Sequence, residues 1–386
     1  MTLKNTSSQT ALGLYVHWPY CAHICPYCDF NVRRDRGQDT NFLVDAIITD
    51  IIGTASRINN SRPLTSVSFG GGTPSRMQPE QIRQILQAAE QVFGFLPDIE
   101  VSLEANPNDN KNGRFQGFAE SGINRLSLGI QSLNPKTLKF LGRDHNVDDA
   151  REALEVAQAI FPSVSADFIY GLPSQSLIAW DKELQDILSL NLPHLSLYCL
   201  TIEPGTSFAR DQKQGKLTAL DDDLTADLYQ CTQEKTTASC LPAYETSNHA
   251  NAASSYSAHN MLYWQGEDWI GVGPGAHGRI TTNGQRQELA SHKRPQDYAQ
   301  AVSKTGWGVQ IQNTISPADD LAERVLLGLR LSAGINLHKL QNRANTGLNP
   351  QAMTNLIETG LLQITNDRLR ATKPLLVDRI ARELLL

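Results

Sequence analysis

The sequence of 386 residues lacks the features that would place it in a membrane or on nucleic acid. No apolar run approaches the ~18 residues that a membrane-spanning helix needs, and residues 1–10 contain one lysine and no apolar core typical of a signal peptide. A basic excess is also missing, because 34 lysines and arginines stand against 40 aspartates and glutamates and give a formal net charge of −6. We therefore expect a globular protein with no transmembrane segment and no nucleic-acid partner.

Cysteine is scarce outside one short segment, Cys21-Ala-His-Ile-Cys25-Pro-Tyr-Cys28. A zinc site usually combines two separated pairs of ligands, and a second pair is missing here. Thiolates at this spacing can instead hold three corners of a cubane 4Fe–4S cluster and leave the fourth iron open. A zinc loop and chance clustering remain the alternatives. Ligands that must stay reduced predict the cytoplasm. No role is assigned to the three other cysteines, which are Cys199, Cys231 and Cys240.

Short apolar segments alternate with amphipathic ones from Leu12 to about Leu200, which is typical of βα units and a parallel sheet. The six expected strands are Leu12–Val16, Val67–Phe69, Glu100–Leu103, Arg125–Gly129, Ser165–Ile169 and Leu195–Leu200. The expected helices between them are Phe42–Ile52, Pro79–Phe93, Phe115–Ser121, Val147–Ile160 and Leu177–Leu190. The alternation alone fits either a barrel or an open, doubly wound sheet.

Polar residues occur where the expected strands end. The turn Gly70-Gly71-Gly72-Thr73-Pro74-Ser75 ends the second strand, Glu104 and Gln131 end the third and fourth, and Asp167 lies within the fifth. Because the carboxyl ends of parallel strands face one common site, we expect these groups to converge with the cysteine loop. The predicted fold is therefore α/β, a partial (β/α)6 barrel with a smaller helical, winged-helix-like C-terminal domain.

The alternation of strands and helices ends near Leu200, and we therefore divide the sequence into three expected regions. Residues 11–220 are expected to form the core barrel, residues 221–290 a barrel extension and connecting segment, and residues 291–386 a C-terminal domain. In the last region, one helix is expected after Ser316-Pro317 and another after Pro350, and Asn366-Asp367 is expected to turn a hairpin.

These motifs resemble the radical S-adenosylmethionine superfamily, in the branch related to oxygen-independent coproporphyrinogen III oxidase. The resemblance extends from residue 12 to the C-terminus. Within this branch, the sequence is most similar to the heme chaperone subgroup. The segments that carry it are Tyr15–Phe30, Gly70–Ser75, Glu104–Pro107, Arg125–Ser132, Leu141–Arg143, Asp167–Pro173 and His259–Trp264. In this superfamily the reduced cluster passes one electron to the sulfonium of S-adenosylmethionine, giving methionine and a 5′-deoxyadenosyl radical.

The resemblance implies a cluster on Cys21, Cys25 and Cys28. It places the backbone of the glycine turn at the methionyl ammonium and Glu104 at the ribose hydroxyls. The whole implied S-adenosylmethionine site is Tyr15, Tyr27, Gly71, Gly72, Thr73, Glu104, Gln131, Arg143 and Asp167. From the residues alone, the glycines also fit an ordinary tight turn, and Arg143 or Asp167 also fits a structural ion pair.

The resemblance also implies a heme site made of His259, Asn260, Tyr263 and Trp264. A neutral imidazole is a normal axial ligand of heme iron, and aromatic rings can cover the porphyrin face. A helix would put His259 and Tyr263 on one face because they are four residues apart. The alternative is a histidine that packs in the core.

Two departures separate this chain from the oxidase. Phe30 stands where the oxidase motif has a fourth cysteine, and the first strand starts about twelve residues from Met1, which leaves no room for the oxidase's N-terminal extension. We therefore expect a heme chaperone that binds a cluster and S-adenosylmethionine, takes electrons from a donor and delivers heme to acceptor proteins. The second hypothesis is an anaerobic coproporphyrinogen III oxidase of porphyrin biosynthesis, and the third is an RNA-modifying radical enzyme, which the acidic charge disfavours. The sequence leaves open whether S-adenosylmethionine is turned over or only bound.

Overall fold

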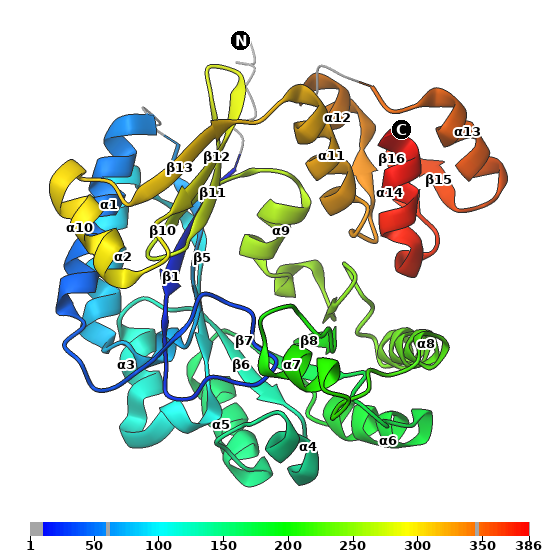
Figure 1. The fold of residues 1–386 in the computed structure, drawn as a ribbon, viewed down its shortest axis with the longest axis horizontal. Helices are drawn as coiled ribbons and strands as arrows, with labels where there is room; N and C mark the ends of the chain where they lie inside the picture. The colour runs from blue at the N-terminus through cyan, green and yellow to red at the C-terminus, as the bar shows by residue number, and fades with distance from the viewer. Residues whose placement is uncertain (1–10, 59–61, 344–346, 386) are drawn as a thin grey trace, which may run out of the picture.

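An eleven-stranded mixed sheet forms the body of the protein, with strand order β13-β12-β11-β10-β1-β4-β5-β6-β7-β8-β9 (Figure 1). The structure is a computed structural model that describes residues 11–58, 62–343 and 347–385. Within those residues, no helix has the length and apolar character needed to cross a membrane. The strands of the sheet are β1 (Leu12–Trp18), β4 (Leu64–Gly71), β5 (Phe95–Ala105), β6 (Arg125–Gln131), β7 (Ser163–Tyr170), β8 (His194–Cys199), β9 (Asn248–Ala250), β10 (Asp268–Val272), β11 (His277–Thr282), β12 (Gln285–Ser291) and β13 (Val309–Thr314).

The six expected strands are present as β1 and β4 to β8, and each pairs in parallel with the next. The intervening helices are α1 (Asn41–Ile58), α2 (Pro79–Phe93), α3 (Arg114–Glu120), α4 (Pro135–Phe140), α5 (Val147–Ile160) and α6 (Leu177–Leu188). Helix α2 has the expected bounds, because Pro79 occupies its first turn and Gly94 ends it with a φ of 72°. This part is therefore the predicted α/β half-barrel.

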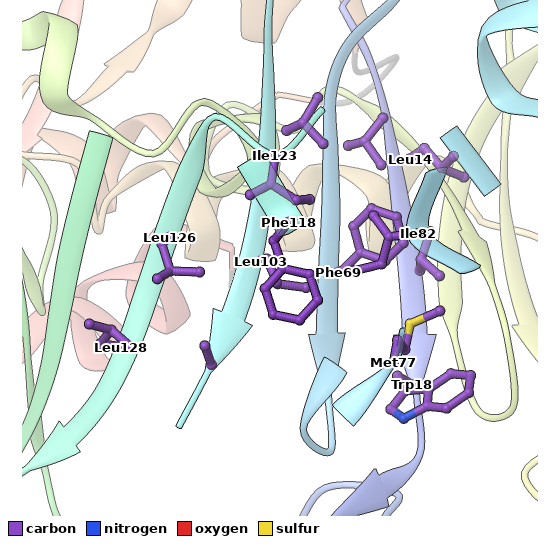
Figure 2. Close-up of a cluster of buried hydrophobic side chains, with 14 of the residues drawn as sticks. Leu14, Trp18, Phe69, Met77, Ile82, Leu103, Phe118, Ile123, Leu126 and Leu128 are labelled. Carbon is purple, nitrogen blue, oxygen red and sulfur yellow. The ribbon is translucent and has the colours of Figure 1, made fainter. Parts of the chain in front are cut away.

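The main core lies between the sheet and the helices that cover its outer face. Phe69 on β4, Leu103 on β5 and Leu126 on β6 point toward Ile82 of α2 and Phe118 of α3 (Figure 2). The alternate positions on the inner face are small or polar, and they include Ser66, Ser127, Ser165 and Ser196. Because side chains alternate along a strand, one face fills the core while the other leaves room inside the half-barrel.

The sheet continues past β1 through four strands that were not predicted. Strand β10 pairs in parallel with β1, and β11 to β13 add antiparallel hairpins. Helix α10 (Pro295–Thr305) packs beside α1 on this extension. The main sheet therefore runs to Thr314, beyond the position 291 at which we expected the C-terminal domain to begin.

The last part of the chain has its own hydrophobic core, which runs from Leu321 to Leu384. Ser316 caps α11, and the hairpin turns at Asn366 and Asp367, whose φ angles are 50° and 59°. The elements of this part are α11 (Pro317–Gly328), β14 (Ile335–Asn336), α12 (Leu337–Arg343), α13 (Pro350–Glu358), β15 (Leu362–Thr365), β16 (Arg368–Ala371) and α14 (Val377–Leu385). Helices around a three-stranded sheet match the predicted helical, winged-helix-like arrangement, and we propose residue 315 as the domain boundary.

Candidate metal and cofactor site

A cavity of about 460 Å³ opens at the carboxyl ends of the parallel strands. Strand ends and the loops after them line it, as a parallel barrel requires. The predicted site residues that line this cavity are Cys21, Cys25, Tyr27, Cys28, Gly71, Gly72, Thr73, Glu104, Gln131, Arg143 and Asp167. The structure therefore brings together residues that are up to 146 positions apart in the sequence, from Cys21 to Asp167.

The cysteine loop is anchored at both ends by backbone pairing. The short strands β2 (Tyr20–Cys21) and β3 (Arg33–Arg34) pair with each other, and the amide of Asp35 donates to the carbonyl of Cys21 at 2.7 Å. Within the loop, the amide of Cys28 donates to the carbonyl of Cys25 at 3.2 Å. These contacts hold three free thiols at the wall of one cavity.

The donor set of this loop fits an iron–sulfur cluster. Burial raises the pKa of the Cys21 thiol to about 11 and also raises the pKa of Cys28, so these thiols ionise only if a positive centre compensates. Soft thiolates suit iron. Among the described residues, no three His, Cys, Asp or Glu side chains converge on a position for one metal ion, whereas the thiols of a cubane each bind a different iron.

The glycine turn packs against the cysteine loop with almost no spare space. Gly71 has a φ of +106°, and a Cβ there would lie 2.4 Å from the imidazole of His17. A Cβ on Gly72 would lie 2.8 Å from the carbonyl oxygen of Trp18 and 3.0 Å from Sγ of Cys21. The turn therefore needs glycine for close approach as well as for backbone conformation.

We expect Gly71→Ala to weaken S-adenosylmethionine binding at least about tenfold, because the new methyl group would displace His17 and the turn. Gly94→Ala is a matched control: its φ is also positive, at +72°, but no atom lies within 4 Å of the added Cβ. Equilibrium dialysis with labelled S-adenosylmethionine measures the effect on the reconstituted protein. Equal dissociation constants for the two variants would contradict the packing argument.

Two carboxylates face each other across the inner side of the half-barrel. Solvent reaches Glu104 through the cavity, while protein surrounds it elsewhere; this burial, together with the charge of Asp167, raises its pKa to about 7. The amide of Gly71 donates to Glu104 at 3.2 Å, and the hydroxyl of Ser127 donates to Asp167 at 3.1 Å. Both carboxylates keep free oxygen lone pairs toward the cavity, which suits them to accept hydrogen bonds from hydroxyl groups.

Arg143 carries the positive charge of the cavity. Its guanidinium donates to Asn106 Oδ1 at 2.6 Å, to the carbonyl of Gly129 at 2.9 Å and to Sγ of Cys25 at 3.4 Å. Within the described residues Arg143 forms no salt bridge with a carboxylate, so these three hydrogen bonds, rather than a structural ion pair, hold its guanidinium in place. A fixed cation beside a thiolate stabilises negative charge on the cysteine loop.

Gln131 is presented to the cavity by an irregularity in β6. Its φ is +70°, and the register between β6 and β7 shifts between Gly129 and Gln131. A left-handed, non-glycine residue at a bulge is a strained conformation that is concentrated at functional sites. The bulge turns the amide of Gln131 into the cavity wall.

The two tyrosines assigned to S-adenosylmethionine occupy different places. Tyr27 lines the cavity and packs on Phe208, with ring centroids 6.3 Å apart. Tyr15 lies behind the glycine turn, where its ring would be 3.0 Å from a Cβ on Gly70, and its hydroxyl contacts His17. Tyr27 is therefore placed to contact a bound cofactor, and Tyr15 to support the turn.

The four residues assigned to heme lie apart from this cavity, on helix α9 (Ala258–Trp264), which packs against the starts of β1 and β4. His259 is buried, and its Nδ1 and Nε2 lie 2.8 Å from the hydroxyls of Ser66 and Tyr263. Trp264 faces a separate small pocket beside α11 and α12. Helix α9 thus closes the amino-terminal end of the half-barrel, opposite the cysteine loop, and both ring nitrogens of His259 are already engaged.

Several residues around the cavity had no predicted role. Asn106 holds Arg143, Ser127 holds Asp167, and Tyr198 completes the wall. His17 fills the space beneath Gly71. Of these, His17, Asn106 and Ser127 lie in segments that carry the family resemblance, whereas Tyr198 had no signal in the sequence.

Comparisons with known proteins agree with this architecture. The family model described as "Radical SAM superfamily" matches residues 15–187, and the model described as "HemN C-terminal domain" matches residues 315–374. A solved structure titled as the coproporphyrinogen III oxidase HemN of Escherichia coli, a radical SAM enzyme, superposes with a TM-score of 0.81 at 22% identity, over 97% of this chain and 90% of that one. At that identity the likeness shows the fold.

Relatives of higher identity span nearly the whole chain. "Heme chaperone HemW" of Bacillus subtilis is 31% identical over 90% of this chain and 92% of that protein, and its namesake from Haemophilus influenzae is 33% identical over 91% and 90%. "Radical S-adenosyl methionine domain-containing protein 1, mitochondrial" of Danio rerio is 36% identical over 86% and 76%. The chain therefore belongs to the radical S-adenosylmethionine superfamily, in the HemN-like branch that includes the HemW heme chaperones.

Proposed function

We propose that this protein is a heme chaperone that binds a 4Fe–4S cluster and S-adenosylmethionine and delivers heme to acceptor proteins. The observation that carries the proposal is the match to proteins named heme chaperone over at least nine tenths of both chains. The coproporphyrinogen oxidase structure shares the fold at only 22% identity. Phe30, at the oxidase's fourth cysteine position, lies 60% exposed at the mouth of the cavity.

In this proposal Cys21, Cys25 and Cys28 hold the cluster, which supplies one-electron chemistry when it is bound. The glycine turn receives the methionyl group of S-adenosylmethionine, and Glu104 accepts hydrogen bonds from the ribose. Arg143 holds negative charge near Cys25. An electron donor would reach the cluster from the side of the exposed cysteine loop. We place the protein in the cytoplasm, although the animal relatives are named mitochondrial.

Heme binding by His259, Asn260, Tyr263 and Trp264 remains a proposal. In the described conformation Ser66 and Tyr263 engage both ring nitrogens of His259, so ligation of heme iron requires helix α9 to shift or His259 to change its partners. Hemin titration of the wild type and of His259→Ala tests this site. An unchanged Soret spectrum in the variant would remove His259 as the axial ligand.

An anaerobic assay separates the chaperone from the oxidase. We expect the reconstituted protein, supplied with dithionite, S-adenosylmethionine and coproporphyrinogen III, to form no protoporphyrinogen IX, while the same preparation binds hemin. Liquid chromatography of the oxidised porphyrins measures the product. Conversion of coproporphyrinogen III would overturn the chaperone proposal and support the oxidase.

A further inference from the structure

A row of aromatic side chains, with His17 and His259 buried and Tyr15 and Tyr263 half-buried, joins helix α9 to the cysteine loop through the inside of the half-barrel. It begins at Tyr263, whose hydroxyl contacts His259, and continues to Tyr15, whose ring centroid lies 6.3 Å from that of His259. It ends at His17, which lies 3.1 Å from the hydroxyl of Tyr15. The row therefore connects the two ends of the half-barrel.

The hydrogen bonds of His17 have a defined direction. The carbonyl oxygen of Asn31 lies 3.0 Å from Nε2 and can only accept, so Nε2 carries the proton. Nδ1 is then an acceptor, and the hydroxyl of Tyr15 must donate to it. Asn31 itself directly follows Phe30 of the cysteine loop and donates from Nδ2 to the carbonyl of Pro274 at 2.8 Å. His17 thus ties the end of that loop to Tyr15.

His17 and Tyr15 also support the glycine turn. The imidazole of His17 occupies the space in which a Cβ of Gly71 would lie, and the ring of Tyr15 packs under Gly70 beside the carboxylate of Glu104. Neither side chain lines the cavity itself. A movement of either ring would affect the turn, because these rings leave no room even for an added Cβ, which would lie 2.4 Å from His17 at Gly71 and 3.0 Å from Tyr15 at Gly70.

We propose that Tyr15 and His17 are positioning residues that couple the packing of helix α9 to S-adenosylmethionine binding at the glycine turn. The proposal rests on the proposed function in requiring that S-adenosylmethionine binds this cavity. Coupling between two sites is reciprocal, so a change of α9 that loosens Tyr15 weakens cofactor binding, and bound cofactor stabilises the packing of α9.

Double-mutant analysis on full-length, reconstituted protein tests the coupling. We expect Tyr15→Phe to raise the dissociation constant of S-adenosylmethionine about tenfold, because it leaves Nδ1 of His17 without its donor. Tyr263→Phe, which lies outside the cavity, is expected to raise it about threefold through His259. In the double variant the increase should stay near tenfold, because the link is already broken.

The barrel offers a control in the buried pair His194 and Tyr244, whose ring nitrogen and hydroxyl lie 2.9 Å apart. Tyr244→Phe removes a similar hydrogen bond, so its loss of thermal stability should resemble that of Tyr15→Phe, while S-adenosylmethionine binding should not change. The electron paramagnetic resonance spectrum of the reduced cluster gives a second readout, since the spectral change on adding S-adenosylmethionine should diminish only in the Tyr15 and Tyr263 variants.

The outcomes separate the coupling from the proposed function. Wild-type affinity in Tyr263→Phe, or threefold and tenfold effects that multiply in the double variant, would overturn the coupling while the cofactor site stands. An equal weakening in Tyr244→Phe would also overturn it, because general destabilisation would then explain the result. Wild-type protein that carries a cluster but binds no S-adenosylmethionine would overturn the proposed function and the coupling with it.

Discussion

Serine in place of Cys21, Cys25 or Cys28 is expected to leave the anaerobically reconstituted protein with almost no cluster iron. Each thiol supplies a separate corner of the cubane, and a hydroxyl is a poorer ligand for iron than a thiolate. The three thiols are free and line one cavity. The loop contains no further cysteine that could replace a lost thiol. Iron and sulfide analysis, with the visible absorbance of the cluster, measures the loss.

Cys199 supplies the sharpest control for this prediction. It is a free cysteine that lines the same cavity, at the end of β8, but it lies outside the loop. Cys199→Ser should therefore retain the full iron content, as should Cys231→Ser and Cys240→Ser. Loss of the cluster in Cys199→Ser, or its survival in Cys25→Ser, would show that a different set of thiols holds it.

The second large effect is expected from the buried imidazole of His259 as the pH falls. Burial lowers the pKa of His259 to about 3, well below its value of ~6.5 in an unfolded chain. The unfolded state therefore binds the proton more tightly, so the contribution of neutral His259 is fully present above pH 6.5 and is lost as the pH falls toward 3. At pH 4 the loss amounts to about 3 kcal/mol of the free energy of unfolding.

The matched variants are His259→Asn and Ser66→Ala. Asparagine can hydrogen-bond without titrating, so His259→Asn should be less stable than the wild type at pH 7, and the difference should shrink by about 3 kcal/mol at pH 4. Ser66→Ala removes one partner but keeps the imidazole, so its stability should fall with pH as steeply as that of the wild type. Denaturant unfolding at several pH values measures both. Parallel curves for the wild type and His259→Asn would contradict the prediction.

The half-barrel is predictable from the sequence because its strands and helices have distinct periods. Strands such as β4 and β7 are short, almost entirely buried segments, and the helices between them show apolar residues at helical spacing. Polar residues at the strand ends then located the site, because parallel topology forces these ends together. Confirmed bounds such as those of α2 and α5 depend on local signals, namely a proline in the first turn or an asparagine cap.

The sheet extension could not be predicted in the same way. Strand β10 is entirely buried and contains a glycine, while β11 to β13 are rich in polar residues, so their sequences show no clear alternation of apolar and polar residues. The pairing of β10 with β1 joins segments that lie more than 250 residues apart in the sequence. Only the folded chain specifies such a contact.

The residues that line the cavity could be predicted from the sequence, but the contacts that hold these residues in place could not. The family pattern identifies Arg143, whereas nothing in the sequence indicates that Asn106 would hold its guanidinium. The same pattern associates Tyr15 with the cofactor, yet the ring lies behind the glycine turn. The placement of His259 at the closed end of the half-barrel likewise depends on the tertiary contacts of α9 with β1 and β4.

The most direct test of the central proposal is the composition of the protein after anaerobic reconstitution and loading with hemin. Iron, sulfide and heme are quantified after gel filtration, in the presence and absence of S-adenosylmethionine. We expect about four cluster irons and four sulfides for each chain, together with about one tightly bound heme. Protein that carries the full cluster but retains no heme, with or without S-adenosylmethionine, would contradict its assignment as a heme chaperone.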